Sequence, residues 1–163
     1  MWHRRAVVLA GLALAACGDP RIKRYDGPEV TRIVVNKGDR RMFLLNGGDV
    51  LRAYKIDLGF APNGHKTIEG DGKTPEGSYY IDRKNPRSAF HLSLGISYPN
   101  VADVAKAESL GQKPGGDIFI HGERRPFDRK GKDWTWGCIS VSNGEVEEIY
   151  SMVKAGTQID IHP

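Results

Sequence analysis

The residues best suited to covalent chemistry lie between residues 118 and 143. This segment contains the pair His121-Gly122 and, further along, the run Trp134-Thr135-Trp136-Gly137-Cys138. Cysteine chemistry needs a thiolate, a base or cation that favours the thiolate, and donors that hold the oxyanion of the substrate. We expect His121 to act as the base for Cys138, and the backbone amides around Gly137 to form the oxyanion hole.

Gly122 adds a third component to this predicted site. Its carbonyl group could accept a hydrogen bond from the imidazole of His121 and so orient the ring, which is the third role in a catalytic triad. A purely structural role fits the same residues, because a free cysteine such as Cys138 is often buried as a small hydrophobic residue. A zinc site that includes His65 and His91 is a further alternative. The sequence contains no closely spaced pair of ligands, so we expect no metal.

Short extended segments separated by turns are expected to position these residues. The chain has 20 glycines and 9 prolines, a composition that favours many short elements over long helices. Strands are predicted over residues 32–36, 41–46, 50–58, 78–82, 90–94, 117–121, 139–141 and 158–161, with a long loop over 59–77. Residues 101–110 can form a short helix, and Ser142-Asn143-Gly144-Glu145 has the form of a helix capping box. The prediction is one mainly β domain with one or two short helices.

Length and composition restrict the class of protein. The 163 residues suffice for one domain, and a net charge of +4 with scattered basic residues does not indicate binding to nucleic acid. The 39% hydrophobic and 27% charged residues exclude a disordered tail and a polytopic membrane protein. The two cysteines are Cys17 and Cys138, too few for a disulfide-rich scaffold or a four-cysteine zinc site.

The beginning of the chain has the form of an export signal. A basic start precedes an apolar run over residues 6–16, which is too short to span a bilayer as an ordinary helix. The junction Leu14-Ala15-Ala16-Cys17 resembles the lipobox of bacterial lipoproteins, which implies cleavage before Cys17 and a lipid on that residue. An ordinary export signal that ends in cysteine is the alternative. We predict a signal peptide over residues 1–16 and an exported, periplasmic protein held at a membrane by its lipid.

The next segment is interpreted as a connection between this anchor and the domain. Residues 17–29 are polar, charged and contain proline, so we expect a lipidated N-terminus followed by a linker, with the folded domain over residues 30–163. Gly18 rather than an aspartate follows the cysteine, which favours the outer membrane over the inner one by analogy with enterobacterial sorting. Removal of the signal lowers the net charge from +4 to +2, because Arg4 and Arg5 are lost.

Several motifs together resemble the L,D-transpeptidase catalytic domain. His121-Gly122 followed by Thr135-Trp136-Gly137-Cys138-Ile139 is similar to the family signature, in which a His-x pair precedes Ser or Thr, a variable residue, Gly and Cys. Asn143 matches the asparagine usually found shortly after that cysteine. Upstream, Thr74-Pro75-Glu76-Gly77 and the strand after it resemble another segment of the family. The resemblance covers residues 30–162 and implies an L,D-transpeptidase-like β-sandwich or barrel.

The resemblance implies a cysteine acyltransferase that acts on peptidoglycan. In the implied reaction Cys138 attacks a stem tetrapeptide and forms a thioester, while His121, oriented by Gly122, transfers the proton. A second amine, from another stem or from a wall-attached lipoprotein, then resolves the thioester. The reaction crosslinks stems or attaches proteins, and it requires neither a metal nor an organic cofactor.

The remaining candidate residues would contact the substrate or its oxyanion. These are Gly137, Thr135, Trp136 and Arg124. Trp136 could equally be a packing residue, and Arg124 with its neighbour Arg125 could be a solvated charge pair. Trp136 stands where many members of the family have histidine, and Ser140 where many have arginine.

These departures leave the choice of acceptor open. Residues 133–139 resemble a branch of the family that is linked to cutting peptidoglycan attachments. A cysteine amidase or carboxypeptidase of the same fold, which hydrolyses stem or lipoprotein linkages, is therefore the alternative to a transpeptidase. A non-catalytic wall-binding module is a third possibility. It is disfavoured because a binding module has no need for His121, Gly137 and Cys138 together.

Overall fold

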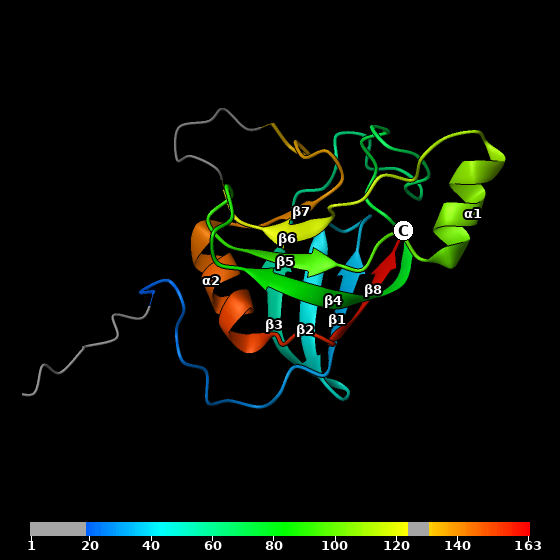
Figure 1. The fold of residues 1–163 in the computed structure, drawn as a ribbon. Coiled ribbons are helices and arrows are strands. Elements are labelled where there is room, and N and C mark those ends of the chain that lie inside the picture. The colour runs from blue at the N-terminus through cyan, green and yellow to red at the C-terminus, as the bar shows by residue number, and fades with distance from the viewer. Residues whose placement is uncertain (1–18, 124–130) are drawn as a thin grey trace, which may run out of the picture.

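In the part of the chain that the structure describes, eight strands form one curled sheet, and two helices pack outside it (Figure 1). The computed structural model describes residues 19–123 and 131–163. In sheet order the strands are β3 (Asp49–Lys55), β2 (Arg41–Asn46), β1 (Arg32–Asn36), β8 (Gln158–His162), β4 (Gly77–Asn85), β5 (Ser93–Ile96), β6 (Phe119–His121) and β7 (Ile139–Ser140). The helices are α1 (Val101–Ser109) and α2 (Asn143–Met152). The predicted mainly β domain with one or two short helices is confirmed.

Strand β4 joins the two halves of this sheet. Its first part, from Gly77 to Tyr80, pairs antiparallel with β8, and its second part, from Ile81 to Asn85, pairs with β5. The register shifts between Ile81 and Arg83, an irregularity that bends a strand and increases its twist. As a result, β4 to β6 run across the direction of β1 to β3 (Figure 1).

Alternating apolar residues fill the space that the curled sheet encloses. Ile33 and Val35 of β1 are fully buried, as are Met42 and Leu44 of β2, in the two-residue period of a strand with one covered face. All four residues of β5 are buried. This strand therefore crosses the interior of the domain and carries no exposed face.

Helix α2 begins at the predicted capping box and leads directly out of β7. The Ser142 hydroxyl accepts from the Glu145 backbone amide, and the Glu145 carboxylate accepts from the Ser142 amide at 2.9 Å. Such reciprocal bonds satisfy amides that a helix start leaves without partners. Val146 and Ile149 are fully buried, so the helix packs its apolar face on the core. The start of α2 is thereby fixed a few residues after Cys138.

The predicted strands over 32–36 and 41–46 have the observed limits, whereas the other six differ at one or both ends, and two of these differences are of interest here. The strand expected over residues 90–94 begins only at Ser93, because His91 has a φ of +70° and an extended strand requires a negative φ. The strand expected over residues 50–58 ends at Lys55, and Asp57 makes an isolated antiparallel bridge to Ser140. Both differences lie next to the predicted site.

Buried lysines hold the long glycine-rich loop in place. The Lys37 ammonium donates to the carbonyl oxygens of Gly64 and Thr74, at 2.7 and 3.0 Å, and to the Glu76 carboxylate at 2.7 Å. All three of its hydrogens therefore have acceptors, which a buried ammonium needs. Lys66, also buried, binds the Asp71 carboxylate at 3.0 Å. The loop is consequently a defined surface against which the catalytic segment can pack.

The segment before β1 lies against the domain. Residues 19–29, part of the predicted linker and here named the N-terminal strap, run beside α2 (Figure 1). The Lys23 backbone amide donates to the Ser151 hydroxyl of α2 at 3.1 Å. The predicted signal peptide and Cys17 lie outside the described residues. Within residues 19–123 and 131–163, no helix has the length and apolar character needed to cross a membrane.

Candidate active site

Two neighbouring parallel strands bring His121 and Cys138 together. Strand β6 ends at His121, and β7 begins directly after Cys138. In their pairing His121 lies opposite Ser140. The side chains of His121 and Cys138 line one pocket of about 200 Å³, together with Asn85, Ser88, Phe90, Ser93, Asp117 and Phe119.

The imidazole of His121 is buried and held in one orientation. Its Nδ1 atom lies 2.7 Å from the carbonyl oxygen of Gly122. A carbonyl oxygen only accepts hydrogen bonds, so in the neutral ring Nδ1 carries the hydrogen and Nε2 carries the lone pair. The rings of Phe90 and Trp134 flank the imidazole, with centroids 4.5 and 5.7 Å away. His121 therefore has the fixed tautomer that a general base requires.

Gly122 occupies a position without room for a side chain. A Cβ atom there would lie 2.5 Å from Oδ1 of Asn143 and 2.9 Å from Cγ1 of Val146. The Gly122 amide donates to the Phe90 carbonyl at 3.1 Å, and Oδ1 of Asn143 accepts from the Glu123 amide at 2.7 Å. Asn143 at the start of α2 thus fixes the backbone just after β6. The sequence pattern identifies this asparagine but not its acceptor role.

The side chain of Cys138 is half-buried in this pocket. Burial raises its pKa to about 11, against the opposing effect of a hydrogen bond from the Phe119 backbone amide. The sulfur also lies 3.5 Å from the carbonyl oxygen of Asp117, an acceptor that favours the protonated thiol. Because the thiolate is the reactive form, a base must remove this proton. The imidazole of His121 lines the same pocket.

Thr135 holds the loop that precedes the cysteine. Its hydroxyl donates to the Cys138 carbonyl at 2.7 Å and accepts from the Gly137 amide at 3.2 Å. Its backbone amide donates to Leu58 and its carbonyl accepts from Phe60, at 3.1 and 2.9 Å. In this arrangement the Gly137 amide must leave the Thr135 hydroxyl before it can bind an oxyanion.

At two positions of the site, the backbone of another segment lies so close that glycine is required. Gly137 has a φ of +124°, and a Cβ atom on it would lie 2.6 Å from the carbonyl oxygen of Lys73. Gly59, whose backbone bridges to Thr135, would place a Cβ atom 2.1 Å from the carbonyl oxygen of Gly72. Only glycine fits such contacts without moving the backbone. The loop that precedes Cys138, residues 133–137 and here named the catalytic loop after its place in the predicted site, is therefore packed main chain against main chain with the glycine-rich loop.

An ion pair anchors the start of the catalytic loop. Nε and Nη2 of Arg40 lie 2.9 and 2.7 Å from the two carboxylate oxygens of Asp133, which also accept from the Leu58 amide at 3.1 Å. Burial alone would raise the pKa of Asp133, but the bonds from Arg40 and Leu58 outweigh it and lower that pKa. Arg40 and Asp133 are 93 positions apart, and no pattern in the sequence connects them.

The family of the chain follows from a match over most of its length. Residues 30–161 match the family model of the L,D-transpeptidase catalytic domain, named YkuD. The chain belongs to the L,D-transpeptidase catalytic-domain family. The match begins just before β1 and reaches into β8, so it contains the whole curled sheet up to Ile161. The resemblance in the motifs is confirmed at the level of the family.

Relatives of this L,D-transpeptidase domain come from several bacteria. YafK of Escherichia coli strain K12, a provisionally named L,D-transpeptidase, is 28% identical over 123 residues, which are 70% of this chain and 44% of YafK. The helical cell shape determining protein Pgp2 of Campylobacter jejuni is 30% identical, with a TM-score of 0.64 over 88% of this chain and 51% of Pgp2. L,D-transpeptidase 1 of Mycobacterium tuberculosis shares the fold at 14% identity, with a TM-score of 0.53 over 83% of this chain and 62% of that one. The chain spans about half the length of the first two relatives.

Among the predicted site residues that lie in the described part of the chain, Trp136 is the most exposed. Its relative exposure is 72%, and its ring packs edge to face on Phe60 with centroids 5.0 Å apart. Arg124 and Arg125, the candidates for binding a carboxylate, lie outside the described residues, as does Cys17.

The two histidines of the zinc alternative have other partners. Nε2 of His65 lies 3.0 Å from the Asp103 carboxylate, and Nε2 of His91 lies 2.8 Å from the Glu147 carboxylate. In the described part of the L,D-transpeptidase domain, no three His, Cys, Asp or Glu side chains gather as ligands for a metal. His65 and His91 thus serve as hydrogen-bonding residues within the fold.

Proposed function

We propose that the chain is an acyl-transfer enzyme that acts on the stem tetrapeptides of peptidoglycan. Sγ of Cys138 attacks the carbonyl carbon of the third residue, an S–C bond forms, and the C–N bond to the terminal D-alanine breaks. The thiol proton passes to Nε2 of His121 and then to the leaving amine. An acceptor amine next attacks the thioester, gives a proton to His121, and releases Cys138 for another cycle.

The observation that carries this proposal is the pairing of His121 and Cys138 in one pocket with a fixed imidazole. The Gly122 carbonyl assigns the hydrogen to Nδ1, so Nε2 is the atom able to accept a proton. The thiol of Cys138 has a pKa of about 11, raised by burial, and needs such an acceptor at neutral pH. Membership in the L,D-transpeptidase family supplies the substrate class. The cell-shape role named for Pgp2 supports a wall substrate as well.

The products of a reaction with purified muropeptides test the proposal. The wild-type protein is expected to release D-alanine, to carry a stem peptide as a thioester on Cys138, and to form dimers linked between two third residues. The Cys138→Ala variant is expected to give neither adduct nor product, with its folding checked by circular dichroism. Turnover that persists in the Cys138→Ala variant contradicts the proposed nucleophile. Stem tripeptides without dimers contradict amine transfer and assign water as the acceptor.

We further propose that the mature protein is exported and held at a membrane by a lipid on Cys17. The support is the run of residues that resembles a lipobox, together with the short apolar segment before it. Metabolic labelling of the full chain with palmitate is expected to mark the wild type and not the Cys17→Ser variant. Fractionation of the cell envelope then shows whether the labelled protein is in the outer or the inner membrane. A wild-type chain that is cleaved but carries no label would contradict the anchor.

A wall-attached lipoprotein is a second source of the acceptor amine in this proposal. Its lysine would replace the stem amine, and the chemistry at Cys138 would be unchanged. A lysine-containing acceptor peptide added to the same reaction is expected to appear in an amide with the stem. Dimers that form without any such adduct assign the acceptor to the stem alone.

A further inference from the structure

The N-terminal strap precedes the part of the chain that matches the family, yet it contacts a loop of the active site. Arg21 is the residue that makes this contact. Its Nη1 donates to the carbonyl oxygen of His91 at 2.7 Å, and its Nη2 donates to that of Pro86 at 2.8 Å. The Asp19 carboxylate accepts from Nε and Nη2 of the same guanidinium, at 2.9 and 2.6 Å. The planar donor fork of arginine thus joins the strap to both ends of the segment 86–91.

This segment carries a residue that touches the catalytic histidine. The ring of Phe90 lies against the His121 imidazole, with centroids 4.5 Å apart. The Phe90 carbonyl accepts from the Gly122 amide, and the Gly122 carbonyl in turn accepts from the imidazole. Two separate contacts therefore lead from Phe90 to the ring of His121. The residue after Phe90 is His91, whose carbonyl Arg21 holds.

The segment needs such support because its backbone is strained. His91 has a φ of +70°, in the left-handed region that is strained for a residue other than glycine. Glu147 of α2 binds the His91 ring at 2.8 Å and also binds the Lys23 ammonium of the strap at 3.2 Å. The strap therefore reaches this turn by two routes, through Arg21 directly and through Glu147.

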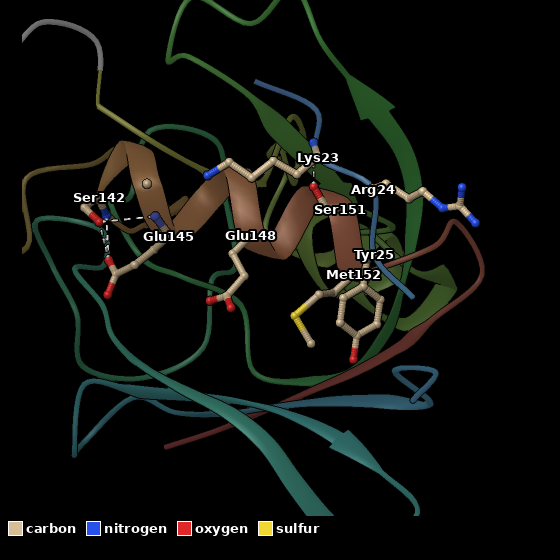
Figure 2. Close-up of a pocket in the computed structure, with 9 residues that line it drawn as sticks. Lys23, Arg24, Tyr25, Ser142, Glu145, Glu148, Ser151 and Met152 are labelled. Atoms are coloured by element: carbon tan, nitrogen blue, oxygen red, sulfur yellow. Dashed lines mark hydrogen bonds between the residues drawn. The ribbon is translucent and has the colours of Figure 1, made fainter. Parts of the chain in front are cut away.

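The strap is itself seated on α2 (Figure 2). The Lys23 backbone amide donates to the Ser151 hydroxyl, and the two residues lie side by side in the figure. Arg24 points away from the helix in the same view, and among the described residues its guanidinium pairs with Asp26 of the strap, at 2.8 Å. The strap thus presents two arginines in one segment, of which Arg21 contacts the active-site loop and Arg24 does not.

We propose that Arg21 is a positioning residue of the active site, and that the strap holds Phe90 and thereby His121 in the orientation that Cys138 requires. Without the guanidinium, the carbonyl oxygens of Pro86 and His91 lose their donor, and the turn at His91 can relax. Phe90 then no longer confines the imidazole. The catalytic unit accordingly includes the strap as well as the part of the chain that matches the family. The catalytic readout of this inference rests on the proposed function.

Substitutions in the full chain test the inference, with Arg24→Ala as the matched control. Arg21→Ala is expected to lower kcat on muropeptides about tenfold, because a small displacement of a catalytic group has an effect of that size or larger. KM is expected to change less than kcat. Arg21→Lys keeps the charge but cannot reach both carbonyl oxygens, so an intermediate kcat is expected. Arg24→Ala is expected to match the wild type in kcat.

A second readout does not depend on turnover. Alkylation of Cys138 by iodoacetamide, followed from pH 6 to 11 by peptide mapping, reports whether His121 still takes the thiol proton. Arg21→Ala is expected to move the midpoint of this profile to higher pH, while Arg24→Ala leaves it in place. If Arg21→Ala does not fold, Arg21→Lys is judged by the same profile.

The possible results separate this inference from the proposed function. Unchanged kcat and an unchanged alkylation profile in the Arg21 variants overturn the positioning role, even if the melting temperature falls. A wild-type protein that turns over no muropeptide overturns the proposed function. The alkylation profile then still decides whether the strap positions His121.

Discussion

The Nδ1 atom of His121 lies 2.7 Å from the carbonyl oxygen of Gly122, the next residue in the chain. Through this contact, the backbone just after β6 determines which nitrogen of the neutral imidazole carries the hydrogen. Because the carbonyl occupies Nδ1, the basic atom of the neutral ring is Nε2. The same glycine has no room for a Cβ atom, so the position that orients the imidazole is also one where the packing excludes a side chain.

Removal of the imidazole is expected to change how Cys138 reacts with iodoacetamide. Burial raises the pKa of the thiol to about 11, so without a base very little thiolate is present at pH 7. In the His121→Ala variant, the alkylation rate is expected to rise steadily up to about pH 11. The wild type is expected to react at much lower pH. Cys138→Ser is the control for labelling at this site, and a His121→Ala profile that levels off below pH 9 would contradict the role of base.

Gly122→Ala is expected to destabilise the protein and to lower its activity. The added Cβ atom would lie 2.5 Å from Oδ1 of Asn143, a clash that typically costs about 1–3 kcal/mol. Denaturant unfolding measures this loss. Gly144→Ala in α2 is the matched control, because nothing lies within 4 Å of its added Cβ atom, and a gain of about 0.5–1 kcal/mol is expected from helix propensity. Equal free energies of unfolding for the two variants would contradict the conclusion that the packing around Gly122 excludes a side chain.

The ion pair between Arg40 and Asp133 is expected to support the catalytic loop. Asp133→Ala leaves the Arg40 guanidinium and the Leu58 amide without their acceptor, which costs about 1–3 kcal/mol for a half-buried pair. Their side chains are only 21% and 10% exposed, so solvent replaces little of the loss. Asp26→Ala removes an exposed pair with Arg24 and is expected to change the free energy of unfolding by less than about 1 kcal/mol. A small effect of Asp133→Ala would show that another group takes over the guanidinium.

Trp136 is expected to contribute to substrate binding and little to stability. Its side chain is exposed and touches Phe60 edge to face, a contact worth about 0.5–1.5 kcal/mol. Trp136→Ala is therefore expected to raise KM for muropeptides severalfold with a small change in melting temperature. Phe60→Ala controls for the loss of the aromatic pair. An unchanged KM in Trp136→Ala would assign the residue to surface packing alone.

Local patterns in the sequence predict those parts of the site that depend on neighbouring residues. The pairing of His121 with Gly122 and the capping box at Ser142 both act within a few positions, so their residue types suffice to identify them. Strand positions follow from alternation for the same reason. The end of β6 at His121 also follows, because the apolar run before it stops there.

Contacts between distant segments could not be predicted in this way. Arg40 and Asp133 are 93 positions apart, and Arg21 and His91 are 70 apart. Each pair consists of common charged or polar residues in turns, where composition predicts only exposure to solvent. The polar, proline-containing composition of the strap predicts a linker, yet its polar groups bind the domain. Long-range hydrogen bonds of this kind depend on the tertiary fold, which no local pattern contains.

Asp160 in β8 is expected to make stability depend on acid pH. Burial alone would raise the pKa of this carboxyl, but bonds from Arg32, Ser78 and Gln158 outweigh it and lower the pKa to about 2. The folded pKa lies below the unfolded value, so the stabilisation is present above about pH 4 and is lost as the pH falls through 2. Melting temperatures are therefore expected to differ strongly between the wild type and Asp160→Asn at pH 7 and to converge near pH 2. Asp26→Asn, at an exposed site, is expected to follow the wild type throughout, and a constant gap between wild type and Asp160→Asn at all pH values would contradict the assigned titration.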